Sequence, residues 1–235
     1  MVAESATFRF KQFELTDRRC GMKLGTDAVV LGVLAGMDRF SRDERIKVAD
    51  IGAGCGIISL MIAQRMPEAA IDAVEIDAGA FSDLVQNVEC SPWSARINVF
   101  EGDFHNLTCE YNLIVSNPPF YKNGEISPTA PRAVARHVGA LSAHTLIDFA
   151  SDRLTADGIL SMIVPAEDTD DAICRAAFKR LSLWRRIDVA TSARRGVTRC
   201  VLEFTRESSA MRVIYKMSTN SEAYKKLTSD FYLDN

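Results

Sequence analysis

The feature that most constrains this chain is a glycine-rich segment, Val48–Ile58, which joins a short apolar run to a helical pattern. Gly52, Gly54 and Gly56 directly follow the apolar run. Glycine allows a tight turn from strand into helix and lets a ligand approach the backbone, while the amino end of a helix offers N–H groups to an anion. Such a turn is typical of α/β nucleotide-binding folds, although it also arises as a purely structural turn.

Short apolar runs alternate with helical patterns along the centre of the chain, as a parallel sheet covered by helices requires. The spacing predicts helices over 57–65, 78–88, 141–154 and 167–181, with another starting at Thr26. Turn signals stand at Ala156-Asp157-Gly158 and Arg195-Gly196, and the tail 211–215 is a candidate edge strand. We therefore expect a doubly wound α/β fold with seven strands, at 48–51, 71–75, 97–100, 113–115, 159–164, 187–189 and 200–204.

The length of 235 residues, with 47% hydrophobic residues, fits a single domain with a sizeable core. We expect an amino-terminal extension over 1–45, a core over 46–206 and a carboxyl-terminal edge segment over 207–235. No apolar run approaches the roughly 20 residues that cross a bilayer, and the first residues lack the layout of a signal peptide. A cytoplasmic protein is expected.

The charge distribution leaves two possibilities open. The formal net charge is -3, yet the segment 175–206 holds nine Lys or Arg residues against two acids, Asp188 and Glu203. This segment forms either one basic surface on an acidic body or a scattered, solvated set of charges.

The six cysteines form no Cys-x-x-Cys pair and have no histidine at zinc-ligand spacing. We therefore expect no metal site and no disulfide framework, and we expect most of the cysteines to lie in the core.

Acidic side chains follow two of the expected strands. Glu75 ends the second strand, where a carboxylate can accept hydrogen bonds from both hydroxyls of a ribose, and Asp77 is a competing candidate. Asp103 follows the third strand, positioned to accept from an adenine amine, although a Gly-Asp turn is also an ordinary structural feature. Because parallel strands end at one edge, these acids are expected to share a crevice.

The fourth strand ends in Asn117-Pro118-Pro119-Phe120, which is the most specific signal in the chain. An aryl amine is a poor nucleophile, so it needs positioning and hydrogen-bond acceptors on its two hydrogens to attack a sulfonium methyl group. The Asn117 Oδ1 atom and the Pro118 carbonyl can be those acceptors. The two prolines hold the turn rigid, and Phe120 offers a face on which a base can stack.

These four segments, in this order, resemble the class I S-adenosylmethionine-dependent methyltransferases of the amino-methylating branch. The run from Arg18 to Gly32 is similar to the opening of the bacterial family that methylates adenosine N6 beside the anticodon of a valine tRNA. The runs 135–137, 194–196 and 230–233 also look like that family. The resemblance implies a Rossmann-like class I methyltransferase fold, with a mostly parallel seven-stranded sheet, helices on both faces and a late antiparallel strand.

The resemblance also implies roles for individual residues. S-adenosylmethionine would be bound by Lys23, Thr26, Asp50, Gly52, Gly54, Glu75, Asp103, Phe104 and Asn117. The catalytic turn would be Asn117, Pro118, Pro119 and Phe120, and RNA phosphates would be held by Arg132, Arg136, His137, Arg194, Arg195 and Arg199. From the residues alone, Thr26 also fits a helix N-cap, and Lys23 fits a solvated turn lysine. The long stretch 120–139 is expected to be a loop beside the site.

The expected activity is methyl transfer from S-adenosylmethionine to N6 of an adenosine in tRNA. Guanine N2 in ribosomal RNA and a glutamine amide in a protein are alternatives within enzymes, and Tyr121 after Phe120 leans toward adenine. Outside that class, the chain could be a non-catalytic RNA-binding module. A dehydrogenase would share the glycine-rich turn but would have no use for the Asn-Pro-Pro-Phe motif.

Overall fold

The computed structural model describes residues 7–37, 39–119, 141–190, 196–207 and 213–233. A hairpin is formed by β1 (Thr7–Arg9) and β2 (Glu14–Thr16). The central sheet contains β3 (Lys47–Ile51), β4 (Ala70–Glu75), β5 (Ile97–Glu101), β6 (Tyr111–Ser116), β7 (Leu154–Pro165), β8 (Ser182–Ala190), β9 (Arg199–Thr205) and β10 (Val213–Ser218). The α-helices are α1 (Thr26–Leu34), α2 (Ile57–Arg65), α3 (Ala78–Glu89), α5 (Ala143–Arg153), α6 (Thr169–Phe178) and α7 (Glu222–Thr228). Short 3-10 turns occupy Ser94–Arg96, Phe104–Asn106 and Ala166–Asp168.

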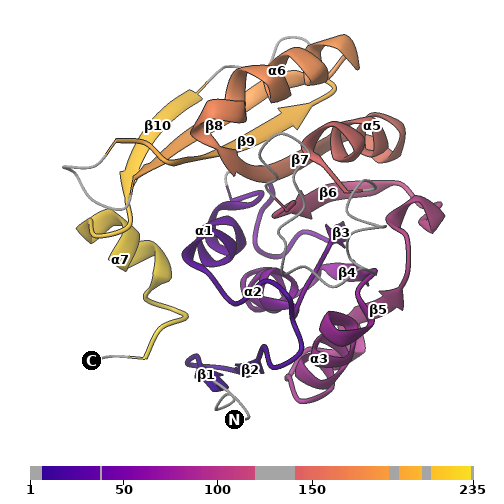
Figure 1. Cartoon of the computed structure of the whole chain (residues 1–235), viewed down its shortest axis with the longest axis vertical. Helices are drawn as coiled ribbons and strands as arrows, with labels where there is room; N and C mark the ends of the chain where they lie inside the picture. Colours follow the sequence, from indigo (N-terminus) through magenta and orange to yellow (C-terminus); the bar gives the residue numbers. More distant parts are fainter. Residues whose placement is uncertain (1–6, 38, 120–140, 191–195, 208–212, 234–235) are drawn as a thin grey trace.

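The eight strands follow the order β10-β8-β9-β7-β6-β3-β4-β5 (Figure 1). β3 to β7 run parallel, and β9 runs antiparallel to both of its neighbours, β7 and β8. This arrangement confirms the expected mostly parallel sheet with a late antiparallel strand. β10 pairs parallel with β8 and confirms the candidate edge strand as an addition to the seven.

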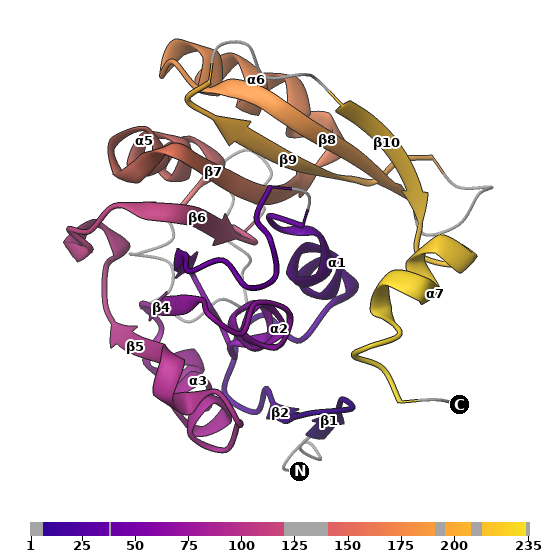
Figure 2. The same ribbon diagram turned by 180° about the vertical axis from the view of Figure 1, so that it is seen from behind.

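Helices cover both faces of the sheet. Successive side chains of each strand point to opposite faces, so a buried strand packs apolar residues against both layers of helices. Val48 and Leu113 pack with apolar side chains of α1, α2 and α3. Their neighbours Ala49 and Ile114 pack on the other face, with α5 and α6. The β1–β2 hairpin and the segment after α7 meet at one end of the molecule, where Lys11 N–H donates to the Phe231 carbonyl at 2.7 Å (Figure 2).

The apolar periodicity located the helices well, and α2 begins and ends at the expected residues. The β1–β2 hairpin and α7 were not expected. Ala156-Asp157-Gly158 was expected to be a turn but lies inside β7, where the register with β6 is irregular between Tyr111 and Leu113. Within the described ranges, no helix is both long and apolar enough to cross a membrane.

The expectation that most cysteines lie in the core is wrong. Cys20, Cys55 and Cys200 are buried, whereas Cys90, Cys109 and Cys174 are exposed. Across the residues that the structure describes, no group of three or more potential ligands is arranged to hold a metal ion.

Candidate active site

The glycine-rich turn stands between β3 and α2, at the carboxyl edge of the sheet. Gly52 and Gly54 have φ angles of +68° and +57°, which residues other than glycine rarely adopt. The N–H groups of Gly52 and Ala53 both donate to the Val74 carbonyl at 3.0 Å, which ties the turn to β4. A Cβ added at Gly54 would meet no heavy atom within 4 Å, so the backbone at this residue is open to a ligand.

Asp50, near the end of β3, is fully buried. Its Oδ2 atom accepts from the Ser59 backbone N–H at 3.0 Å and from the Ser59 hydroxyl at 2.6 Å, so the carboxylate satisfies one donor in the first turn of α2. Its Oδ1 atom is buried with no hydrogen-bond partner among the described residues. The pKa of Asp50 is raised to about 7: burial raises it most, the negative charge of Glu75 adds to the rise, and the Ser59 bonds act in the opposite direction.

Glu75 ends β4 and supports the same turn. Its Oε2 atom accepts from the Gly54 N–H at 2.8 Å, and its Oε1 atom accepts from the N–H groups of Ile76 and Asp77 at 2.8 Å. Burial raises the pKa of Glu75, and these backbone bonds act in the opposite direction. A carboxylate has about four lone-pair sites, so three bonds leave room for one more hydrogen, and a contact to both ribose hydroxyls remains a prediction.

Asn117 follows β6 at the same edge. The Oδ1 atom of Asn117 is buried and has no hydrogen-bond partner within the part of the chain that the structure describes. Pro118 is buried and Pro119 is half-buried, whereas Phe120 lies outside the described residues. The turn thus contains a buried hydrogen-bond acceptor, Asn117 Oδ1, to which no described residue donates.

Ser116 joins the Asn117 turn to the glycine-rich turn. The backbone pairing of β3 with β6 ends at Asp50 and Val115, and the Ser116 hydroxyl then donates to the Ile51 carbonyl at 2.7 Å. Ser116 is fully buried. Neither this serine nor Ser59 was predicted from the sequence, although a hydroxyl directly before the Asn-Pro-Pro motif was a usable signal.

Asp103 and Phe104 have structural roles in this structure. Asp103 Oδ1 accepts from the His105 backbone N–H at 2.9 Å and lies 2.7 Å from His105 Nδ1, at the start of a 3-10 turn. The ring of Phe104 is buried and packs edge-to-face on Phe149. Their contacts with a cofactor remain predictions, and the burial of the Phe104 ring gives no support to a contact made by that ring.

The segment before α1 corrects one expectation. Thr26 is not the N-cap of α1, because Gly25 takes that position with an extended backbone and without a capping side chain. Lys23 Nζ donates to the carbonyl oxygens of Asp17 and Arg18, so its ammonium stabilises the local loop. Cofactor contacts by Lys23 and Thr26 stay predictions.

The basic segment 175–206 does not form one basic surface in the described residues. Arg175 and Lys179 pair with Asp148, Arg186 pairs with Asp188, and Arg185 is buried on Glu203. The structure therefore favours scattered charges.

The expected phosphate contacts are mostly untested. Arg199 Nε donates to Asp27 Oδ2 at 2.8 Å and is half-buried, so its guanidinium is already paired. Arg132, Arg136, His137, Arg194 and Arg195 lie outside the described residues.

The residues of the crevice fit S-adenosylmethionine. This cofactor carries hydroxyl and amino donors, and the carboxyl edge of the sheet, where a crevice is expected, holds buried acceptors without partners in the described residues at Asp50 and Asn117. The backbone at Gly54, in the same glycine-rich turn, is open to a ligand. Asp50, the glycine-rich turn and Glu75 are the residues that would hold it.

Comparisons with known proteins agree with this geometry. The family model described as "Methyltransferase small domain" matches residues 33–187. A protein from Aeromonas hydrophila, named tRNA1(Val) (adenine(37)-N6)-methyltransferase, is 37% identical over 240 residues and covers 99% of each chain. Proteins of the same name from Musicola paradisiaca and Salmonella enteritidis are 35% and 36% identical, and each match covers 96% of this chain and 94% of the relative.

Solved structures share the fold at lower identity. A predicted O-methyltransferase from Agrobacterium tumefaciens has a TM-score of 0.66 at 19% identity, with 87% of this chain and 96% of that chain covered. TYW2 from M. jannaschii, solved in complex with AdoMet, has a TM-score of 0.56 at 12% identity, with 86% and 87% covered. With the near full-length relatives and the crevice geometry, these findings lead to one conclusion: the chain belongs to the methyltransferase small domain family and is an S-adenosylmethionine-dependent methyltransferase.

Proposed function

We propose that this protein methylates N6 of the adenosine at position 37 of tRNA1(Val), the reaction that the names of its relatives describe. The observation that carries the proposal is the buried Oδ1 atom of Asn117, which has no partner among the described residues and lies at the carboxyl edge of the sheet beside the glycine-rich turn. An acceptor at this place suits an exocyclic amino group, which has two hydrogens to donate.

Asn117 Oδ1 would accept one hydrogen of the adenine amine, and the Pro118 carbonyl would accept the other. Two acceptors fix the direction of the nitrogen lone pair, and holding the amine in that geometry removes much of the entropic cost of reaction. They also stabilise the positive charge that develops on the nitrogen. The Ser116–Ile51 bond would hold this turn at a fixed distance from the cofactor-binding turn.

S-adenosylmethionine, when bound, supplies an electrophilic methyl group on a sulfonium. The chain's own contribution is to bind, orient and exclude water, and no side chain need remove a proton before transfer. The amine becomes strongly acidic once it is alkylated, so the proton can pass to solvent afterwards. This accounts for an acceptor pair with no general base among the residues assigned to the site.

Position 37 lies beside the anticodon, where bases are only partly stacked. Bringing such a base into the crevice costs less than flipping one out of a duplex. A methyltransferase domain can therefore reach such a target by itself, and a tRNA substrate implies action in the cytoplasm.

The test uses unmodified tRNA1(Val) transcript, labelled S-adenosylmethionine and nucleoside analysis of the product. We expect label in N6-methyladenosine, and none in a matched transcript with guanosine at position 37. Label in N2-methylguanosine, or label in protein when cell extract replaces the transcript, would contradict the proposal.

A further inference from the structure

The loop Asp17–Leu24, between β2 and α1, has a defined shape. The Leu24 N–H donates to Asp17 Oδ2 at 2.9 Å, and Lys23 Nζ donates to the Asp17 and Arg18 carbonyl oxygens. These bonds join the two ends of the loop. The backbone between these two ends therefore has a fixed shape.

The same loop is fixed to α3. The backbone N–H groups of Arg19 and Cys20 donate to Asp83 Oδ2 at 2.6 and 3.2 Å, and Arg19 NH1 donates to Ser82 Oγ at 3.0 Å. The Arg19 carbonyl approaches the first turn of α3 so closely that a Cβ on Gly79 would come within 3.0 Å of it. Because α3 begins just after Glu75, the loop lies beside the carboxyl end of β4, where Glu75 supports the glycine-rich turn.

The acidic side chains that hold the loop are buried, whereas its basic side chains are exposed. The carboxylates that hold it in place are buried, since Asp17 and Asp83 are 3% and 0% exposed. The side chains of Arg19 and Lys23 are 54% and 62% exposed although their charged groups also bond to the protein. The Arg18 side chain is also exposed and has no hydrogen bond or ion pair to any described residue.

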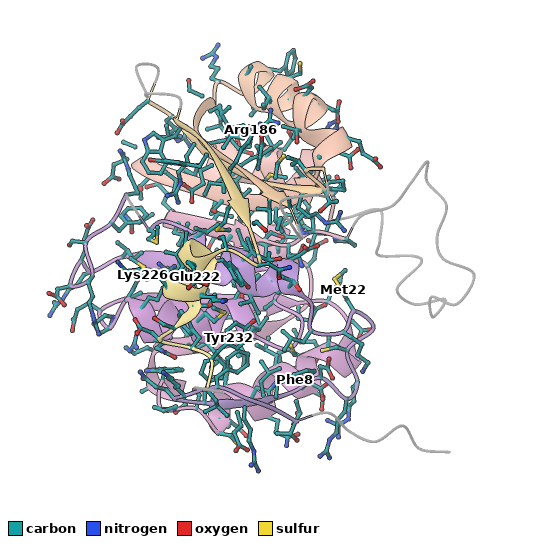
Figure 3. The ribbon with its side chains drawn as sticks, turned by 90° about the vertical axis from the view of Figure 1, so that its left-hand side faces the viewer. Phe8, Met22, Arg186, Glu222, Lys226 and Tyr232 are labelled. Atoms are coloured by element: carbon teal, nitrogen blue, oxygen red, sulfur yellow. The ribbon has the colours of Figure 1, made fainter. Side chains whose placement is uncertain are left out.

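An apolar side chain lies among these cations. Met22 is 54% exposed, and Figure 3 places it at the margin of the molecule. A Cβ added at the neighbouring Gly21 would meet no heavy atom within 4 Å, so the backbone next to Met22 is open as well. Exposed cations beside an exposed thioether suit a partner with both phosphates and unstacked bases, which is single-stranded RNA.

We propose that the Asp17–Leu24 loop binds the RNA substrate at the rim of the crevice, with Arg18 on a phosphate and Met22 against a base or ribose next to the target nucleotide. The inference rests on the proposed function, because it takes the anticodon loop as the partner. It adds a contact surface to the arginines of 120–140 and 191–195, for which phosphate contacts are expected from the sequence.

The experiment compares Arg18→Gln and Met22→Ala with Arg45→Gln. Arg45 precedes β3 at the opposite edge of the sheet, and its side chain is 88% exposed in a long ion pair with Glu68, so the control makes the same charge change away from the crevice. The affinity for unmodified tRNA1(Val) is measured by fluorescence anisotropy over a range of salt concentrations. The affinity for S-adenosylmethionine is measured in parallel by calorimetry.

Arg18→Gln should weaken tRNA binding several-fold and make the salt slope shallower by about one. Met22→Ala should weaken binding without changing the slope, because its contact is uncharged. Neither variant should change the affinity for S-adenosylmethionine. The proposal is overturned if Arg18→Gln binds tRNA as Arg45→Gln does, or if its only defect is in cofactor binding.

The binding assay separates this inference from the proposed function. If the wild-type protein fails to methylate adenosine 37 but loses tRNA affinity on Arg18→Gln, the proposed function fails and the RNA-binding rim stands. If methylation is confirmed and Arg18→Gln matches the control, only the rim fails.

Discussion

Two groups of buried polar side chains in this molecule are satisfied to different degrees. Around the carboxyl end of α1, Glu203 accepts from the Gly36 N–H, the Ser161 hydroxyl and Arg185, and Arg185 also donates to the Leu34 carbonyl. At the crevice, Asp50 and Asn117 each keep a buried oxygen without a partner in the described residues. A buried polar atom left unpaired costs free energy, so it persists where a ligand uses it.

The comparison distinguishes buried polar groups that stabilise the fold from buried polar groups that are available to a ligand. The described residues contain five buried side-chain atoms without partners, and two of them, on Asp50 and Asn117, flank one glycine-rich turn. The α1 group should therefore govern folding stability at every pH, whereas the crevice group should govern binding and rate and should make stability depend on pH.

The largest effect on stability is expected for Arg185→Met. This change leaves Glu203, which is fully buried, without its cationic partner and should lower the free energy of unfolding by about 3–5 kcal/mol. Urea denaturation measures it. Arg186→Met is the control, because Arg186 is partly exposed in its pair with Asp188 and should cost less. Equal losses in the two variants would contradict a special role for the buried pair.

Asp50→Asn should remove a pH dependence of stability. Since the folded-state pKa of Asp50 is raised to about 7, the folded protein holds this proton more tightly than the unfolded chain does. The wild-type free energy of unfolding should therefore fall relative to Asp50→Asn as the pH rises from about 4 to about 7, by up to about 4 kcal/mol, and stay level above that. Urea titrations at four pH values measure the difference. Parallel curves for the two proteins would show that Asp50 ionises normally.

Glu75→Ala should weaken the binding of S-adenosylmethionine by about 1.5–3 kcal/mol, or roughly tenfold to a hundredfold. Because Glu75 also accepts from Gly54, Ile76 and Asp77, the free energy of unfolding should fall as well. Calorimetry and denaturation measure the two effects. Unchanged affinity in a folded variant would remove Glu75 from the cofactor site.

The smallest effect is expected from two buried serines on neighbouring strands. Ser116→Ala and Ser161→Ala each remove one buried hydroxyl bond and should cost about 1 kcal/mol of stability. Only Ser116→Ala should lower the rate of methyl transfer, since Ser116 links the Asn117 turn to β3. Ser116→Thr, which keeps the hydroxyl, should recover part of that rate. A rate loss of the same size in both alanine variants would mean that stability alone controls activity.

Sequence periodicity predicted the core of this fold because the central strands are buried and their ends carry distinctive residues. Asn117-Pro118-Pro119 and the glycine-rich turn are each a continuous run of residues, so the chemistry of each could be inferred from neighbouring positions in the sequence. The strands of the β1–β2 hairpin are three residues long, too short to show a period of two.

Contacts between distant residues could not be predicted in this way. Arg199, for which a phosphate contact remains a prediction, pairs with Asp27, which is 172 positions away in the chain. The Asp83 carboxylate fixes the loop at Arg19 from 64 positions away. Thr26 is a residue type that often caps helices, yet Gly25, with an extended backbone, is the N-cap of α1. The contacts of Arg199 and Asp83 depend on tertiary packing rather than on local preference.

The most direct test of the account is single-turnover methylation of tRNA1(Val) by Asn117→Ala, with the fold checked by circular dichroism. The variant loses one of two acceptors aimed at the charge developing on the amine, so the rate should fall about a hundredfold to a thousandfold, or roughly 2.7–4 kcal/mol. Affinity for S-adenosylmethionine should change little, and Asn117→Asp should keep more activity than Asn117→Ala. A near-wild-type rate in folded Asn117→Ala would contradict the claim that the buried oxygen of Asn117 positions the amine.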